Sequence, residues 1–442
     1  MTGFAGLATC VHCGFCLQSC PTYVATGDEA DSPRGRIVLM RGLATGELTL
    51  EDVHVQHHLD RCLGCRACEP VCPSGVSYGP ALEAARAMIG ERRPSPLLVR
   101  VILHVITRPS LRGLLFGLAR VARPIAGALA GWSRLGFAAG MLAGSRVRGI
   151  DRSRDRGIEG SGDRGVDGRQ AGGAGIDPAI PRSRDPSRPA ACVFLGCVQR
   201  ELFGHVNRAA ARTLRVNGYT LHEVSPQGCC GALHAHAGQL ETARALARAN
   251  VRAFAAFPET LVAATAAGCG AMLREYGSLL ADDPLAEDAA RFAARVRDVT
   301  ELLAEVGPEP GAPLPLRVAY DAPCHLVHAQ RVADAPLAVL QAIPALVIAP
   351  HAESDACCGS AGLYSLVQRA LARDILHRKL DALAAVSPDM VVTGNPGCAM
   401  QLSAGLRATG RATPVAHPVE LLDASYARAG RYAEDAVDSR GP

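Results

Sequence analysis

The sequence of 442 residues predicts an α+β multidomain protein, with a helical N-terminal domain followed by two repeated α/β domains that each contain a parallel sheet. Two observations lead to this prediction. A run of four cysteines with one fixed spacing occurs twice near the N-terminus. A sparser set of four cysteines, centred on Cys-Cys-Gly, also occurs twice in the C-terminal half, among alternating strand and helix patterns.

The N-terminal runs have the spacing of bacterial two-cluster ferredoxins, in which the fourth cysteine of each run ligates the other cluster. The first run is Cys10, Cys13, Cys16 and Cys20 before Pro21, and the second is Cys62, Cys65, Cys68 and Cys72 before Pro73. We therefore expect a two-cluster domain over residues 1–92. One [4Fe–4S] cluster would be held by Cys10, Cys13, Cys16 and Cys72, and the other by Cys62, Cys65, Cys68 and Cys20.

Zinc is the alternative cofactor for these runs, because Cys-x2-Cys pairs also bind zinc. Two separated pairs are enough for zinc, however, and leave the third cysteine and the Cys-Pro of each run unexplained. The spacing therefore favours iron–sulfur clusters.

The middle of the chain changes composition twice. Residues 93–148 are predicted to form a basic amphipathic helical connector, rich in arginine and with no acidic residue from 97 onward. Its uncharged stretches are well short of the roughly 20 residues that a membrane-spanning helix needs. Its helices could pack on the other domains or lie in the interfacial layer of a membrane, and both interpretations stay open. Residues 149–190 consist mainly of Gly, Arg, Asp, Ser and Pro, and predict a disordered linker.

Composition limits the partners and the compartment. The formal net charge is only +4, and Lys379 is the single lysine among 46 basic residues. Without an interleaved basic and aromatic surface we expect no nucleic-acid partner. The N-terminus has no signal-peptide pattern, and free thiolates fit a reducing compartment. The expected location is the cytoplasm, with peripheral contact to the cytoplasmic face of the inner membrane as an open extension.

The C-terminal half is an internal repeat, predicted to form two domains over residues 191–310 and 311–442. The first copy contains Cys197, Cys229, Cys230 and Cys269, and the second contains Cys324, Cys357, Cys358 and Cys398. Between the first cysteine and the pair there are 31 residues in one copy and 32 in the other, and between the pair and the last cysteine there are 38 and 39. Gaps that match so closely indicate a duplication.

The single cysteines of each copy follow short apolar runs, for example Val193–Leu195 before Cys197. In open parallel sheets, ligands gather outside the carboxyl ends of the strands, so we expect the four thiols of each copy to converge on a cofactor. Gly231 and Gly359 would let the backbone approach that cofactor closely. Whether an additional iron–sulfur cluster occupies either copy stays open.

The alternative for the repeat is that its cysteines are buried structural residues. Two adjacent cysteines cannot both face the core from one strand, which favours cofactor binding. Cys192 has no partner in the other copy and is interpreted as an ordinary buried strand residue. His325 and His328 flank Cys324 and could donate to sulfur or transfer protons, but the first copy has no counterpart.

Together these motifs resemble the iron–sulfur subunits of bacterial glycolate oxidase. The similar phrases are Ser32-Pro-Arg-Gly-Arg36, Cys72-Pro-Ser-Gly75, Gly268-Cys-Gly-Ala-Met272, Pro323-Cys-His-Leu326 and Cys357-Cys-Gly-Ser-Ala-Gly362. The resemblance covers nearly the whole chain except residues 149–190.

The resemblance implies a part in the oxidation of glycolate to glyoxylate, and of D-lactate to pyruvate. Hydride removal from a 2-hydroxy acid needs a two-electron acceptor, whereas clusters accept single electrons. The sequence shows no flavin fingerprint, so we expect FAD only on partner flavoprotein subunits and no catalytic residue in this chain. Electrons would pass from the flavoprotein through the clusters to a quinone-level acceptor.

Three alternatives remain. The same relay could serve a lactate dehydrogenase or an anaerobic glycerol-3-phosphate dehydrogenase. A thiol/disulfide enzyme similar to heterodisulfide reductase would need a Cys-x2-Cys end in each copy, where this chain has Met272 and Gln401. The last alternative is a zinc-stabilised assembly scaffold without redox function.

Overall fold

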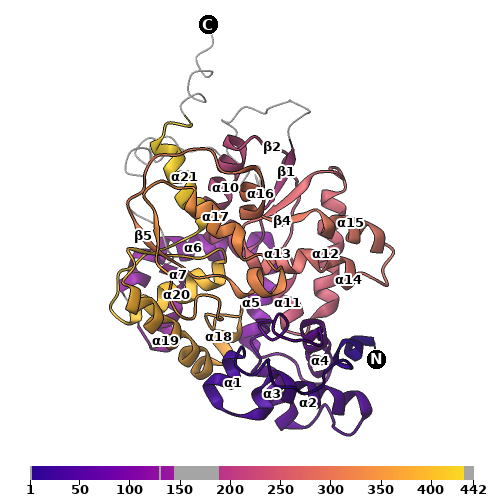
Figure 1. The fold of residues 1–442 in the computed structure, drawn as a ribbon. Helices are drawn as coiled ribbons and strands as arrows, with labels where there is room; N and C mark the ends of the chain where they lie inside the picture. The colour runs from indigo at the N-terminus through magenta and orange to yellow at the C-terminus, as the bar shows by residue number, and fades with distance from the viewer. Residues whose placement is uncertain (1, 129–130, 144–188, 433–442) are drawn as a thin grey trace.

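Two four-stranded parallel sheets form the upper body of the molecule, and the N-terminal helical unit lies below them (Figure 1). The computed structural model describes residues 2–128, 131–143 and 189–432. The predicted linker over residues 149–190 therefore lies almost entirely outside the described residues.

The N-terminal unit contains short helices around the two cysteine runs. Its elements are the 3-10 helices η1 (Thr2–Leu7) and η2 (Glu29–Asp31) and the α-helices α1 (Pro21–Thr26), α2 (Pro33–Thr45), α3 (Val53–Asp60) and α4 (Tyr78–Arg92). The α2 helix begins where the sequence signals a start, because the Ser32 side chain accepts a hydrogen bond from the Gly35 N–H and Pro33 occupies the first turn. Met40, Leu59 and Ala85, each fully buried, join α2, α3 and α4 into one small core.

Three connector helices follow, namely α5 (Leu97–Thr107), α6 (Pro109–Ala128) and α7 (Arg134–Ala143). The α5 helix buries Val99, Leu103 and Ile106, which are three or four residues apart and so share one face. Among the described residues, no single helix is long and apolar enough to cross a membrane. Only α5 together with the first half of α6 passes that test, as a pair bent by 107°.

The first repeated unit has the strand order β2-β1-β3-β4, with all strands parallel. Its strands are β1 (Ala190–Phe194), β2 (Thr220–Leu221), β3 (Leu261–Ala264) and β4 (Val296–Asp298). Its helices are α9 (Val198–Leu202), α10 (Gly204–Val216), α11 (Ala232–His236), α12 (Leu240–Phe254), α13 (Ala267–Arg274), α14 (Tyr276–Leu279), α15 (Ala286–Ala294) and α16 (Val299–Val306).

The second repeated unit has the equivalent order β6-β5-β7-β8, again all parallel. Its strands are β5 (Arg317–Tyr320), β6 (Val347–Ile348), β7 (Met390–Val392) and β8 (Val415–Ala416). Its helices are α17 (Asp334–Gln341), α18 (Tyr364–Val367), α19 (Arg369–Val386), α20 (Pro396–Ala408) and α21 (Pro418–Arg428), with a π-helical turn at His325–Ala329. The predicted fold class is confirmed: a helical N-terminal unit and two α/β units with parallel sheets.

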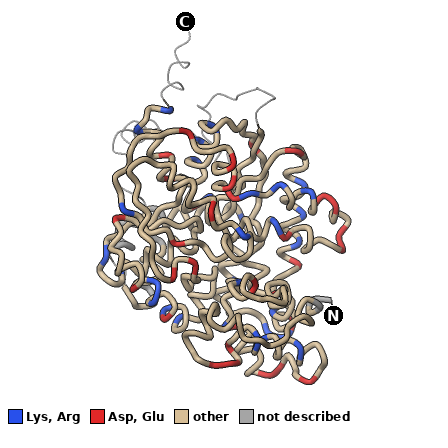
Figure 2. Tube along the Cα trace, viewed as in Figure 1, with Lys and Arg blue, Asp and Glu red and all other residues tan. Residues whose placement is uncertain are grey.

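The two sheets share one hydrophobic core, to which β1 contributes Val193 and β7 contributes Val391, both almost fully buried. At the edge of this core, the Arg212 guanidinium on α10 pairs with the Asp423 carboxylate on α21 at 2.5 Å. Basic and acidic residues are both spread over the molecule (Figure 2). The repeated units therefore pack as one body.

Candidate iron–sulfur sites

The eight N-terminal cysteines line two small cavities, and Cys72 lies beside the first run whereas Cys20 lies beside the second. Site A is the small cavity lined by Cys10, Cys13, Cys16 and Cys72. Site B is a second small cavity lined by Cys20, Cys62, Cys65 and Cys68. Cys68 and Tyr78 line both cavities, so the two sites are neighbours.

The two sites differ in exposure. In site A the Cys13 side chain is exposed and its three partners are half-buried. In site B all four cysteines are buried. Burial raises the pKa of the Cys65 and Cys68 thiols well above the usual value, so they would remain protonated without a metal. Iron binding displaces such protons, and a metal cluster therefore suits this donor set.

One candidate metal group lies outside the cysteine sites. Asp28, Asp31 and His58 each have a possible metal-ligand atom, and these three atoms lie within 4.8 Å of one another. This is the one such group of three within residues 2–128, 131–143 and 189–432, and it contains no cysteine. Asp31 in that group already pairs with Arg36 at 3.2 Å and with Arg61 at 2.7 Å. This group is therefore an ion-pair network.

Arg36 carries a positive charge to site B. Its side chain is fully buried, and it donates to Thr22 Oγ1 at 2.9 Å. Thr22 Oγ1 in turn lies 3.2 Å from Cys20 Sγ. Burial alone would raise the pKa of Cys62, but the charges of Arg36 and Arg86 and a hydrogen bond from Tyr78 bring it below the usual value. Arg36 and Arg86 therefore stabilise negative charge on the Cys62 sulfur of site B.

The first repeated unit brings its four thiols together as site C1. Cys197 follows β1, Cys269 lies on α13 after β3, and the Cys229–Cys230 pair ends the loop after β2. The Sγ atoms of Cys197 and Cys229 are 3.4 Å apart, and those of Cys230 and Cys269 are 3.3 Å apart. Ile106 of α5 packs on this site beside Cys197 and Cys229. The connector therefore covers site C1.

The second repeated unit forms the equivalent site C2. Its thiols are Cys324, Cys357, Cys358 and Cys398, and the Cys324 and Cys357 sulfurs are 4.0 Å apart. Hydrogen bonds from Cys357 and Cys398 hold the pKa of Cys358 well below the usual value. Of the two histidines near Cys324, His325 contacts the sulfur, with its Nδ1 atom 3.8 Å from Cys324 Sγ. His328 instead contacts the Asp355 carbonyl through Nε2 at 3.0 Å.

A buried ion pair distinguishes C2 from C1. Lys379 on α19 donates to an oxygen of Asp321, and the side chains of Lys379 and Asp321 are both 1% exposed. Lys379 also donates to the Glu353 carbonyl at 2.6 Å. The corresponding position of C1 is Asn250 on α12, which donates to the Cys229 carbonyl at 2.9 Å. Site C2 therefore has a buried cation beside its thiols where C1 has a neutral amide. The sequence signalled this residue only as the single lysine of the chain.

The two Cys-Cys-Gly glycines adopt the backbone conformation that requires glycine. Gly231 and Gly359 have φ values of +91° and +82°. A Cβ on Gly359 would lie 2.6 Å from the Ala372 carbonyl oxygen, and one on Gly231 would lie 3.3 Å from the Ala243 backbone. The glycine of each loop therefore lies close to a long helix, α12 in the first repeat and α19 in the second, which fixes the cysteine loop against that helix.

The N-terminal unit docks on both repeats, and this docking joins site B to site C2. Cys65 of site B packs in one buried cluster with Cys324 and Cys357 of site C2. The Tyr364 hydroxyl of α18 donates to the Arg61 carbonyl at 2.9 Å. Sequence reasoning missed this contact, because no local pattern links residues so far apart in the chain.

The comparisons with known proteins agree with this arrangement. The model of the 4Fe-4S dicluster domain family matches residues 6–76, and that of the cysteine-rich domain family matches residues 191–274 and 318–403. Iron–sulfur clusters are therefore the cofactors of the chain.

Two relatives cover nearly the whole chain. A probable glycolate oxidase iron–sulfur subunit of Bacillus subtilis (strain 168) is 34% identical over 96% of this chain and 94% of that protein. The glycolate oxidase iron–sulfur subunit of Escherichia coli (strain K12) is 34% identical over 94% and 93%. Lactate utilization protein A of Geobacillus thermodenitrificans (strain NG80-2) is 26% identical over 52% of this chain and 97% of that protein. By these similarities the chain is a component of an oxidoreductase complex and belongs to the family of glycolate oxidase iron–sulfur subunits.

Proposed function

We propose that this chain relays electrons within a glycolate or D-lactate dehydrogenase complex, from a partner flavoprotein to a quinone-level acceptor. The observation that carries the proposal is the series of neighbouring thiol sites. Site A reaches the surface at Cys13, Cys68 lines both A and B, and Cys65 packs against Cys324 of site C2. Such a series suits stepwise transfer of single electrons.

The chemistry divides between subunits. Oxidation of a 2-hydroxy acid releases two electrons with a hydride, which a flavin accepts, whereas iron–sulfur clusters carry one electron at a time. The residues of this chain hold and tune the clusters, and the FAD would reside on the partner subunits. Arg36 and Arg86 favour negative charge at site B, and Lys379 does so at site C2.

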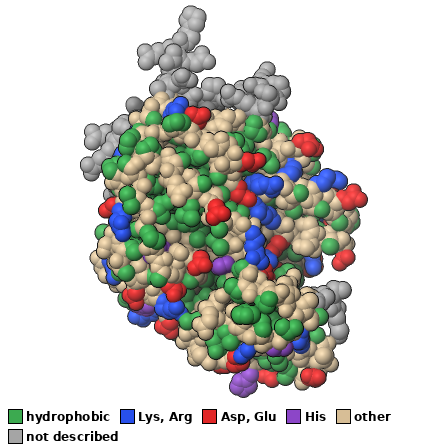
Figure 3. All heavy atoms as spheres, in the orientation of Figure 1, with side chains coloured by type: hydrophobic (Ala, Val, Ile, Leu, Met, Phe, Trp, Pro, Cys, Tyr) green, Lys and Arg blue, Asp and Glu red, His purple; other side chains and the backbone are tan. Residues whose placement is uncertain are grey.

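The partner would dock where site A meets the surface. Val11 and Phe15 flank the exposed Cys13 and are 69% and 68% exposed. Exposed hydrophobic side chains beside a redox site are typical of a protein interface. Hydrophobic side chains also reach the surface of the lower lobe in the space-filling view (Figure 3).

Peripheral membrane contact is part of the proposal. The outer faces of α5 and α6 expose Leu97, Leu98, Val101, Leu111, Leu114, Leu115, Leu118 and Val121. An apolar stripe with arginines among its neighbours suits the interfacial layer at the cytoplasmic face of the inner membrane. The bend of 107° between the two helices lets both lie on one surface.

A lactate relay is the second candidate, and the similarity to lactate utilization protein A supports it. A thiol/disulfide enzyme has less support. Met272 and Gln401, at the positions where a fifth cysteine would be needed, are buried at 3% and 1% exposure and offer no thiolate.

The test is reconstitution under anaerobic conditions. The purified holo-chain alone should oxidise neither glycolate nor D-lactate with an artificial acceptor, and adding the flavoprotein partner should produce the activity. The ratio of glycolate to D-lactate turnover in the complex decides between the two substrates. Oxidation of either acid by the isolated chain would refute the relay.

A further inference from the structure

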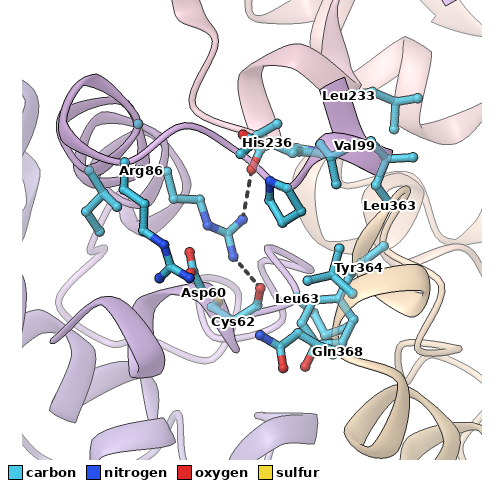
Figure 4. A pocket seen from close by; sticks show the side chains of 18 of the residues that line it. Asp60, Cys62, Leu63, Arg86, Val99, Leu233, His236, Leu363, Tyr364 and Gln368 are labelled. Carbon is cyan, nitrogen blue, oxygen red and sulfur yellow. Dashed lines mark hydrogen bonds between the residues drawn. The ribbon is translucent and has the colours of Figure 1, made fainter. Parts of the chain in front are cut away.

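A cavity of about 340 Å³ lies where the N-terminal unit, the start of the connector and both repeats meet (Figure 4). The α4 helix supplies Ile89 and the connector supplies Val99. Leu233 comes from the first repeat, and Leu363 and Tyr364 come from the second. The volume falls within the range of about 300–1,000 Å³ that is typical of small-molecule sites.

The cavity touches site B without being part of it. Cys62 and Leu63 line both the cavity and site B. A molecule in the cavity would therefore lie against a ligand of the site B cluster.

The walls are mainly apolar, and several of their polar groups are already engaged. Arg86 donates to the carbonyls of Cys62 at 2.5 Å and His236 at 3.2 Å, as Figure 4 shows, and so holds two walls together. Asp60 and Arg93 are the other charged lining residues, and Arg93 donates to the Gln56 side chain at 3.1 Å. The remaining polar side chains include Gln368 of the second repeat and His57 of α3. His57 Nε2 faces the Arg61 guanidinium at 3.3 Å and must accept from it, which leaves the ring proton on Nδ1. A planar ring with polar oxygens suits such a lining.

The mouth of the cavity continues into the apolar surface of the connector. Pro94 and Pro96 line the cavity, and Leu97 and Leu98 directly after them are 73% and 54% exposed. The apolar stripe of α5 and α6 therefore starts at the rim. A lipid-soluble molecule could therefore move along this apolar surface to the rim, where Arg93 is the charged side chain next to Pro94.

We propose that this cavity binds the quinone acceptor, a planar ring with two carbonyl oxygens and an apolar tail. This inference rests on the proposed relay and assigns its exit site. Each dione takes two electrons and two protons to become the diol. The electrons come from oxidation of the 2-hydroxy acid in the partner and arrive singly through site B, and the protons come from water at the open mouth.

Val367 allows the cavity to be filled with little disturbance, because it lines the cavity and its side chain is 45% exposed. Val306, the last residue of α16, is equally exposed at 45% and is not among the lining residues. The test therefore compares Val367→Trp with the matched control Val306→Trp in the assembled flavoprotein complex. Gln368→Leu is a second variant that removes an amide without adding bulk.

Three rates are measured with glycolate as donor. With decylubiquinone as acceptor, Val367→Trp should raise the KM at least tenfold, and Gln368→Leu should raise it severalfold. With ferricyanide, which can take electrons at the exposed site A, both variants should stay within twofold of wild type. Titration of the full-length holo-chain with decylubiquinone should show the same loss of affinity for Val367→Trp and none for Val306→Trp.

Unchanged quinone kinetics and binding in Val367→Trp would overturn the assignment of the cavity while leaving the relay intact. A wild-type complex that reduces ferricyanide but never decylubiquinone would refute the quinone acceptor itself. Equal losses in Val367→Trp and Val306→Trp would also overturn the cavity, since the effect would then not depend on its position.

Discussion

Replacing Lys379 with methionine tests how the second repeat accommodates a buried charge beside its thiols. Burial raises the pKa of Asp321 to about 7 even with Lys379 beside it. Without the ammonium group that pKa rises further, because Lys379 is the cation that opposes the effect of burial. The carboxyl group would then stay protonated in the folded protein at neutral and mildly alkaline pH.

The magnitude follows from proton linkage. Asp321 has a raised folded pKa, so its contribution favours folding at low pH and is lost as the pH rises from its ordinary value of 3.8 to about 7. In the wild-type protein, the free energy of unfolding stops falling for this reason near pH 7. In Lys379→Met it continues to fall as the pH rises above 7. The stability gap between the two proteins should therefore widen by about 1.4 kcal/mol for each pH unit above 7, or about 3 kcal/mol by pH 9.

The single tryptophan provides the assay. The Trp132 ring stacks on His377 with centroids 4.5 Å apart, and the Arg373 guanidinium lies 4.5 Å from the Trp132 centroid. Both partners belong to α19, the helix that carries Lys379. Trp132 fluorescence during anaerobic guanidinium unfolding at pH 6, 7, 8 and 9 therefore reports on this helix directly.

Two controls make the result decisive. Arg378 lies on the same helix as Lys379 and forms a partly exposed pair with Glu353 of the cysteine loop. Arg378→Met breaks that pair and should cost at most about 1 kcal/mol, with no added pH trend. Adding Asp321→Asn to Lys379→Met should remove the pH trend, because no carboxylate remains to titrate. A gap of equal size at pH 6 and pH 9 would refute the reasoning.

Two further predictions concern the N-terminal unit. Cys20→Ala should remove the cluster of site B and spare that of site A, so iron should fall by about four per chain, with Cys192→Ala as the control that keeps all the iron. EPR of the reduced proteins identifies the surviving cluster, and loss of the site A signal alone would contradict crossed ligation. Phe15→Glu should weaken binding of the flavoprotein at least tenfold, measured by surface plasmon resonance, while the iron content stays unchanged. The control is Val347→Glu, at a position in β6 that is 51% exposed, and it should bind the flavoprotein normally. Normal affinity in Phe15→Glu would place the interface elsewhere.

The features that could be predicted from the sequence are those that depend on the spacing of cysteines along the chain. The spacing of the cysteine runs predicted that Cys72 lies near the first run and Cys20 near the second, and they line the corresponding cavities. Which cysteines ligate each cluster stays a prediction. The repeated gaps predicted the thiols of C1 and C2, because strand ends in a parallel sheet meet at one edge.

The features that could not be predicted depend on how distant elements dock. The contact between Cys65 and Cys324 and the cavity beside Cys62 exist only because the N-terminal unit lies across both repeats. The burial of charged residues could not be predicted from the sequence either. Arg36 has the sequence context of an ordinary surface arginine, and yet it is fully buried. Its ion pair with Asp31 and its bond to Thr22 form only in the assembled core.

The central claim is that electrons leave the flavoprotein through the clusters of this chain. Cys65→Ser tests it most directly, because Cys65 is the site B ligand that packs against site C2. In the assembled complex, anaerobic stopped-flow should show glycolate bleaching the flavin at the wild-type rate, while steady-state quinone reduction falls at least tenfold. Cys192→Ala, which changes a buried cysteine of β1 outside all four sites, should leave both rates unchanged. Normal quinone reduction by a fully assembled Cys65→Ser complex would contradict the account.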